Sequence, residues 1–202
     1  GHGSKLASVA NLPYLAWIAV ALGQPGRRLA WTGALALVVG LQLLRGHPQI
    51  AFYGFLLVAL IGLVELGAGV WQRRGRAELA RYAGALAGGV LLGVGIAAVL
   101  LLPVRAYAPE SIRGASEAGG ATFQYATNWS LSPREIATFF VPSAMGFGEG
   151  SYAGDMPFTN FPNYLGLGVL LFGGAAFVLL RGRLLWTLSL VAVLALFVSF
   201  GR

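Results

Sequence analysis

The chain has 202 residues, of which 57% are hydrophobic and only 10% are charged, with a formal net charge of +7. The apolar residues form long blocks rather than the 3.6- or 2.0-residue periods of half-buried elements, which excludes an ordinary soluble domain. The chain has no cysteine, so disulfides and thiolate metal sites are excluded. The basic residues lie in short clusters between apolar blocks, a pattern that indicates orientation in a membrane rather than nucleic-acid binding.

Six apolar blocks follow one another along the chain, and most are long enough to approach the roughly 30 Å hydrocarbon core of a bilayer. They are residues 6–22, 29–44, 50–71, 82–104, 161–180 and 184–200. We therefore predict an all-α integral membrane protein with about six transmembrane helices. Pro13 is expected to kink or shorten the first helix near its outer end. Because the chain lacks an initiator methionine and stops after an apolar run, we expect an internal piece of a longer protein.

Arginine-rich connections alternate along the chain with connections that carry fewer arginines. This alternation predicts on which side of the membrane each connection lies. Loops 23–28, 72–81 and 181–183 carry most of the arginines, and the positive-inside rule makes these loops cytoplasmic. The turn at 45–49 and the loop at 105–160 are then extracytoplasmic. Arginine supplies all but one of the basic residues and Ala and Gly are abundant, which suggests a GC-rich bacterial genome and hence a bacterial cytoplasmic (inner) membrane.

The order of the blocks predicts three sections. Residues 1–104 form a four-helix transmembrane section, residues 105–160 an extracytoplasmic loop, and residues 161–202 two further transmembrane helices. A loop of this length exceeds what a simple connector needs. The fourth helix carries the spacings Gly84–Gly88 and Gly89–Gly93, which allow another helix backbone to approach closely.

One stretch of the outer loop predicts a short helix near residues 133–141. Ser132 is placed as the N-cap, Pro133 begins the helix, and Glu135 completes a capping box. The apolar side chains that follow fall on one face, so we expect an amphipathic helix on the outer membrane surface.

Basic residues at the predicted outer helix ends are the first candidate site. The positive-inside rule disfavours Lys5, Arg45 and Arg105 there, so each needs a reason. One reading is snorkelling to ordinary lipid phosphates. The other is a cationic, hydrogen-bonding pocket for one particular phosphate, in which arginine is the bidentate partner. The residues that would join this pocket are His2, His47, Gln49 and Tyr53.

Glu65 is the second candidate, because a carboxylate inside a transmembrane helix is a functional candidate by default. Its position near the cytoplasmic end and the neighbouring Arg73 and Arg74 favour a structural or snorkelling role over a proton relay. Two distant histidines are weak evidence for a metal. No cofactor is evident from the sequence, and binding of a divalent metal ion is left as an open alternative.

Several stretches together resemble the middle section of the bacterial YfhO family of large polytopic membrane proteins. They are "GHGSK", "LLRGHPQIAFYGFLL", "LLP" followed by Ser111-x-Arg113, "WSLSPREIATFFVP", Tyr152-Ala153-Gly154 and "NYLGLGVLLF". That family looks like part of the GT-C superfamily of glycosyltransferases.

The resemblance implies transfer of a sugar from a polyprenyl-phosphate donor to an envelope glycopolymer or lipid acceptor on the extracytoplasmic face. It places Ser111 and Arg113 among the substrate-binding residues and the catalytic acidic residue upstream of Gly1. Two other readings stay open: a transporter or flippase of lipid-linked substrates, and a non-catalytic membrane scaffold. The partners would be the lipid bilayer, the donor and the acceptor, and no nucleic acid.

Overall fold

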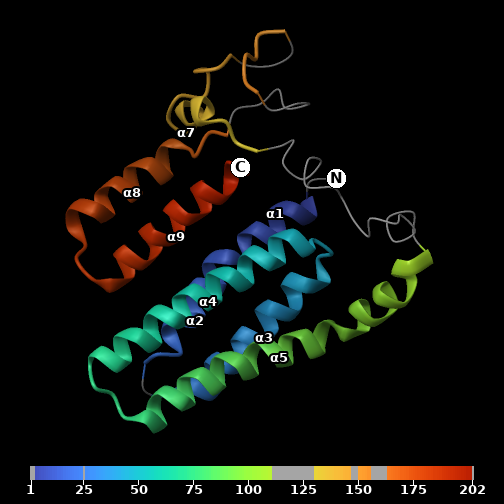
Figure 1. Cartoon of the computed structure of the whole chain (residues 1–202), viewed down its shortest axis with the longest axis vertical. Coiled ribbons are helices and arrows are strands. Elements are labelled where there is room, and N and C mark those ends of the chain that lie inside the picture. The colour runs from blue at the N-terminus through green and yellow to red at the C-terminus, as the bar shows by residue number, and fades with distance from the viewer. Residues whose placement is uncertain (1–2, 25, 111–129, 147–149, 156–162, 202) are drawn as a thin grey trace. The chain divides into compact units, whose positions relative to one another are not determined.

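The computed structural model describes residues 3–24, 26–110, 130–146, 150–155 and 163–201, and these residues form helices and no strand. The chain divides into two compact units, Gly1–Ser111 and Ile112–Arg202. The all-α class predicted from the sequence is confirmed (Figure 1).

Unit 1 contains the first four predicted apolar blocks as long helices. Its elements are α1 (Gly3–Ala10), α2 (Leu12–Ala21), α3 (Arg28–Leu44), α4 (Pro48–Trp71), α5 (Arg76–Tyr107) and the 3-10 turn η1 (Ala108–Glu110). The first block is interrupted at Asn11, two residues before Pro13, which lies in the first turn of α2. Proline has no N–H to donate and is tolerated there, so the predicted kink is present as a helix break.

Glycines set how closely the helices of unit 1 approach. A Cβ added to Gly89 of α5 would lie 2.8 Å from Leu35 Cδ2, and one added to Gly93 would lie 2.5 Å from Val39 Cγ1. The Gly89–Gly93 spacing therefore allows the predicted close helix contact, and the structure identifies α3 as the partner of α5. The order of the contacts shows that these helices run parallel. Gly84 has no atom within 4 Å of its added Cβ and faces open space.

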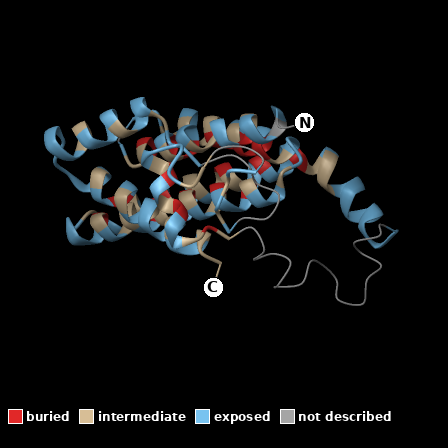
Figure 2. Cartoon of the chain, turned by 90° about the horizontal axis from the view of Figure 1, so that it is seen from above, coloured by how far each residue is buried: buried red, intermediate tan, exposed pale blue. Residues whose placement is uncertain are grey.

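The core of unit 1 lies between α2, α3, α4 and α5. α2 and α4 also run parallel, because Gly54 meets Leu15 near their starts and Gly23 meets Glu65 near their ends. The buried cluster is Leu15, Ile18, Leu22, Leu35, Val39, Val58 and Tyr82. Figure 2 shows buried residues gathered between helices and exposed residues over much of the outside.

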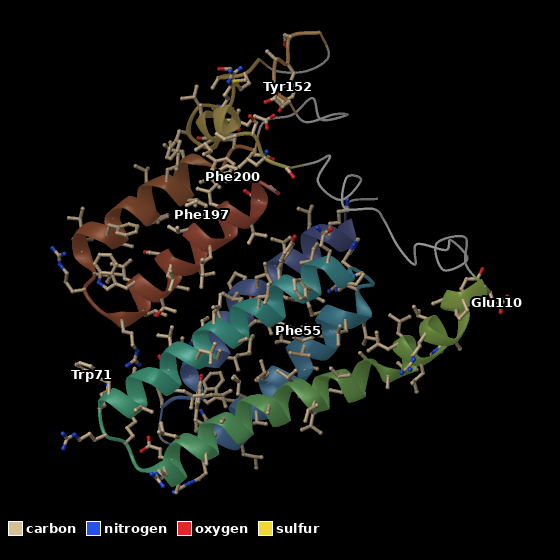
Figure 3. All side chains as sticks on the ribbon, in the orientation of Figure 1. Phe55, Trp71, Glu110, Tyr152, Phe197 and Phe200 are labelled. Atoms are coloured by element: carbon tan, nitrogen blue, oxygen red, sulfur yellow. The ribbon has the colours of Figure 1, made fainter. Side chains whose placement is uncertain are left out.

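Unit 2 contains the 3-10 turn η2 (Pro133–Ile136), α7 (Ala137–Phe140), α8 (Leu167–Leu179) and α9 (Arg183–Ser199). Leu131 N–H donates to the Ser199 carbonyl at 2.8 Å, and Leu165 N–H donates to the Phe139 carbonyl at 3.2 Å. Near the C-terminal end of α9, the rings of Phe197 and Phe200 meet edge to face at 6.3 Å (Figure 3).

The predicted surface helix is present as η2 and α7, but its burial differs from the expected pattern. Glu135 and Thr138 are buried, whereas Phe140 is exposed. The polar side chains face the protein because they hydrogen-bond within it, which leaves the apolar side chain outside. The boundaries of the three predicted sections stay predictions, because residues 111–129, 147–149 and 156–162 lie outside the described residues.

Two helices are long and apolar enough to cross a membrane, by length and composition alone. They are Pro48–Trp71, with a mean hydropathy of 2.2, and Arg76–Glu110, with a mean hydropathy of 2.5. Four shorter apolar helices accompany them: Lys5–Ala21, Arg28–Leu44, Leu167–Leu179 and Arg183–Ser199. Within α8 no residue is buried, and within α9 only Thr187 is.

Candidate functional site

The turn between α3 and α4 places the first group of predicted site residues. Gly46 has φ of +70° and donates its N–H to the Leu43 carbonyl, so α3 ends in a left-handed residue that glycine adopts without strain. Pro48 then begins α4, where no N–H is needed. The result is a tight turn that carries Arg45 as the C-cap of one helix and His47 as the N-cap of the next.

The side chains of this turn are accessible. Arg45 and Gln49 are exposed, and His47 is half-buried. Gln49 Nε2 donates to the Tyr53 hydroxyl at 3.3 Å, so the two polar residues predicted one helical turn apart do meet. Phe52 lies beside Tyr53 with ring centroids 6.0 Å apart. The turn therefore presents one guanidinium, one imidazole and one amide–phenol pair at this end of unit 1.

The other predicted residues lie at different distances from the turn. Lys5 is exposed on α1, which packs against α4. Val39 lies against Gly93, so Arg45 is level with about Val99 of the parallel α5. Arg105 is six residues further along α5, or about 9 Å beyond Arg45 along the helix axis, and is not gathered with the turn.

Three predicted site residues, His2, Ser111 and Arg113, lie outside the described residues. Glu110, at the end of η1, marks the limit of the described part of unit 1 (Figure 3).

A buried amide pair lies one helical turn below Arg45. Asn11, at the break between α1 and α2, donates through Nδ2 to Gln42 Oε1 at 2.9 Å. Gln42 is 1% exposed, and its Nε2 has no hydrogen-bond partner among the described residues. Sequence reasoning missed this pair, although a glutamine inside an apolar block was the available signal.

Glu65 belongs to a different place, at the opposite end of unit 1. It lines a small open pocket with residues from the α2–α3 and α4–α5 connections and from the beginnings of α3 and α5: Gly23, Arg28, Arg74, Glu78, Leu79 and Tyr82. A Cβ added to Gly23 would lie 3.2 Å from Glu65 Oε2, so the carboxylate packs closely against this glycine. The Tyr82 hydroxyl donates to the Ala19 carbonyl at 3.0 Å and closes the inner side of the pocket.

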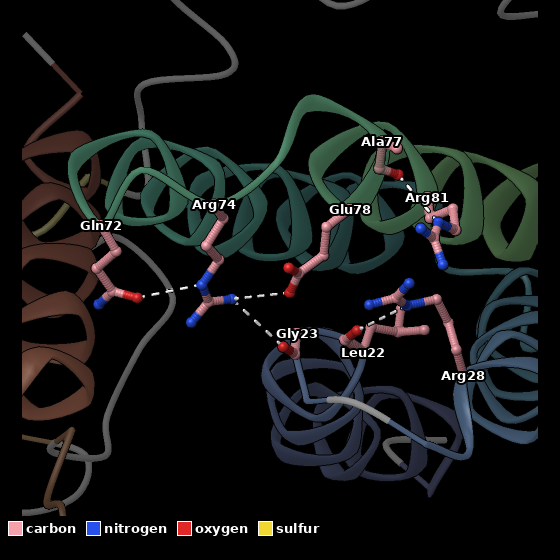
Figure 4. Close-up of polar contacts among 8 residues, drawn as sticks. All are labelled: Leu22, Gly23, Arg28, Gln72, Arg74, Ala77, Glu78 and Arg81. Atoms are coloured by element: carbon pink, nitrogen blue, oxygen red, sulfur yellow. Dashed lines mark hydrogen bonds and ion pairs between the residues drawn. The ribbon is translucent and has the colours of Figure 1, made fainter.

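Arg74 joins the two connections at this end, as Figure 4 shows. Its Nη1 lies 3.5 Å from the Gly23 carbonyl and 3.9 Å from Glu78 Oε1, and its Nε donates to Gln72 Oε1 at 3.1 Å. Arg28 Nε similarly reaches the Leu22 carbonyl at 3.4 Å. The structural or snorkelling role expected of Glu65 stays a prediction.

Unit 2 holds a buried carboxylate, Glu135, which the sequence placed in a capping box. Glu135 Oε2 accepts the Ser132 N–H at 2.9 Å, and Oε1 accepts a hydrogen bond from the Tyr152 hydroxyl. Burial raises the pKa of Tyr152 to about 12, helped by the hydrogen bond to Glu135 and by the charges of Glu135 and Asp155. A Cβ on Gly154 would collide with both side chains, so the Tyr152-Ala153-Gly154 stretch depends on this glycine.

Within the described ranges, no group of three or more His, Asp or Glu side chains could hold a metal ion. Comparison of the chain with protein-family models, with curated proteins and with solved structures gave no match. The resemblance to the YfhO family therefore stays a prediction.

Proposed function

We propose that this chain is part of a polytopic membrane protein of six spans that transfers sugars from a polyprenyl-phosphate donor on the extracytoplasmic side. The observation that carries the proposal is the α3–α4 turn, which presents Arg45, His47 and the Gln49–Tyr53 pair together at one helix-bundle end. A guanidinium and an imidazole suit a phosphate or pyrophosphate, and an amide–phenol pair suits sugar hydroxyls.

The membrane setting of the proposal is supported by where apolar side chains lie. Large apolar residues point outward from several helices: Leu29 (87% exposed), Trp71 (90%), Val99 (76%), Phe172 (80%) and Leu179 (76%). Such exposure is costly in water and favourable in lipid. Buried polar groups between helices, such as the Asn11–Gln42 pair, are also the means by which membrane helices associate.

In the proposed mechanism, Arg45 holds the donor phosphate and stabilises the negative charge that develops on it as the glycosidic bond to phosphate breaks. His47 donates a hydrogen bond to the same phosphate, and Gln49 and Tyr53 orient the sugar. The acidic residue that accepts the acceptor's proton is proposed to lie upstream of Gly1, as the resemblance implies.

A transporter of lipid-linked substrates is the second candidate, because the break at Asn11 interrupts the first apolar block of unit 1, and interrupted helices are typical of transporters. Transfer of sugar and movement of the donor across the bilayer separate the two functions.

The test is sugar transfer by the protein in lipid nanodiscs supplied with polyprenyl-phosphate sugars and membrane-extract acceptors. Arg45→Ala should lower kcat/KM by roughly 30- to 1,000-fold, the effect of losing about 2 to 4 kcal/mol of transition-state stabilisation. Arg81→Ala, an exposed arginine at the opposite end of unit 1, is the matched control and should be nearly silent. Near-full transfer by Arg45→Ala would reject the assignment, and donor movement without transfer would favour the transporter.

A further inference from the structure

The opposite end of unit 1 from the α3–α4 turn is strongly basic. Arg74 brings the α2–α3 and α4–α5 connections together there, through its contacts to the Gly23 carbonyl and to Glu78 (Figure 4). We call this region the basic end and define it by its six arginines: Arg27, Arg28, Arg73, Arg74, Arg76 and Arg81. Among the described residues of unit 1, only Glu65 and Glu78 oppose them nearby, so the basic end keeps a net positive charge.

The two glutamates do not neutralise the outer arginines. Glu78 lies 3.9 Å from Arg74, and Glu65 lies against Gly23 inside the pocket. By contrast, Arg27, Arg73 and Arg76 are exposed, and their side chains make no hydrogen bond or ion pair with any residue that the structure describes. Their guanidinium groups are therefore available to an external anion.

Arg81 adds a fourth exposed guanidinium to this set. Within the described part of the chain, only the Nε of Arg81 is engaged, in a hydrogen bond to the Ala77 carbonyl at 3.1 Å.

Apolar side chains are exposed directly beside these arginines. Leu29, next to Arg28, is 87% exposed, and Trp71, two residues before Arg73, is 90% exposed and projects from the end of α4 (Figure 3). Trp17 is 59% exposed and meets Trp31 edge to face at 5.2 Å near the same end. Tryptophan favours the boundary between headgroups and hydrocarbon.

We propose that the basic end binds the phosphate headgroups of anionic phospholipids. Arg27, Arg73, Arg76 and Arg81 would contact phosphate oxygens, while Leu29 and Trp71 enter the acyl-chain boundary. Guanidinium groups pair bidentately with phosphate, and arginines next to membrane helices attract anionic lipids. A soluble phosphate or a nucleic acid would use the arginines but has no place for the exposed leucine and tryptophan. This proposal needs the membrane setting but not glycosyl transfer.

The test compares the phospholipids retained by the purified protein after exchange into mixed micelles of phosphatidylglycerol and phosphatidylcholine, counted by native mass spectrometry. The triple variant Arg27→Gln/Arg73→Gln/Arg76→Gln should lose most of its selectivity for phosphatidylglycerol, by about fivefold for each arginine. The matched control, Lys5→Gln/Arg105→Gln/Arg134→Gln, removes the same charge elsewhere and should keep most of that selectivity. Equal loss in both triples would overturn the proposal in favour of a net-charge effect.

Two further measurements complete the test. One uses a variant that keeps the charge, and the other offers soluble anions to the protein in place of phosphatidylglycerol. The triple Arg27→Lys/Arg73→Lys/Arg76→Lys keeps the charge and should retain much of the selectivity, so a collapse there would overturn a charge-based site. Inorganic phosphate and a single-stranded oligonucleotide are added to protein in phosphatidylcholine alone. Neither should raise its thermal stability as much as phosphatidylglycerol does, and an equal or larger rise with either would assign the basic end to a soluble anion.

Discussion

Tyr152 donates a hydrogen bond from its hydroxyl to Glu135, a carboxylate whose residue is only 1% exposed. The same carboxylate accepts the Ser132 N–H, so it ties the start of the short helical segment to the stretch around Gly154. Loss of the phenol would leave one oxygen of a buried carboxylate without its partner, which is the costly kind of hydrogen-bond loss.

The titration of Tyr152 is the first prediction. Its folded pKa of about 12 lies above the ordinary value of about 10, so the folded state holds this proton more tightly than the unfolded state. The resulting stabilisation is fully present below about pH 10 and is lost as the pH rises through about 12. Difference titration of tyrosinate absorbance between wild type and Tyr152→Phe should show one step near pH 12. A step near pH 10 would contradict the prediction, and Tyr164→Phe, an exposed tyrosine, is the control.

Helix packing in unit 1 gives the second prediction. Gly93→Ala should destabilise the protein by about 1 to 3 kcal/mol, because the added Cβ would collide with Val39 and with the Ala36 carbonyl at 2.8 Å. Gly88→Ala, on the same helix with no atom within 4 Å, should be neutral or stabilising by up to about 1 kcal/mol. Thermal unfolding in a mild detergent measures both, and equal effects would mean that α5 does not pack on α3 through Gly93.

The third prediction concerns the buried amide pair. Asn11→Ala and Gln42→Ala should each lower the free energy of unfolding, since the first leaves the buried Gln42 carbonyl oxygen unpaired and the second leaves the half-buried Asn11 amide unpaired. In a double-mutant cycle the two changes should be less than additive, with an interaction energy of about 0.6 kcal/mol and at most about 1.7 kcal/mol. Strict additivity of the two losses would show that the hydrogen bond is absent in the membrane.

Arg73 gives the fourth prediction, because it is the one described residue other than glycine with a positive φ, at 54°. It follows the C-cap of α4, where Arg74 N–H donates to the Gly69 carbonyl and closes the helix end. Arg73→Gly should raise the free energy of unfolding by about 1 kcal/mol relative to Arg73→Gln. Both variants remove the charge, so the difference isolates the backbone. Equal stability would argue against the left-handed conformation.

Local sequence features were enough to predict the helices, the break before Pro13 and the turn at Gly46. Each depends on neighbouring residues, because apolar block length, the missing proline N–H and the freedom of glycine act along the chain. The Gly89–Gly93 contact was predicted as packing chemistry, but its partner helix was not. The sequence also predicted which arginine-rich connections share a side of the membrane, and this stays a prediction. The structure shows that two of these connections, both in unit 1, meet through Arg74.

Contacts between distant residues needed the tertiary structure. Asn11 meets Gln42 across 31 positions, and Tyr152 meets Glu135 across 17, because helix packing and loop closure bring together polar groups that must be satisfied once buried. The same packing leaves Arg105 beyond the α3–α4 turn, since α5 continues past the end of α3. Composition and the local order of residues along the chain therefore determined the helices and their ends. The register in which the helices pack against one another decided which polar groups lie together in one site.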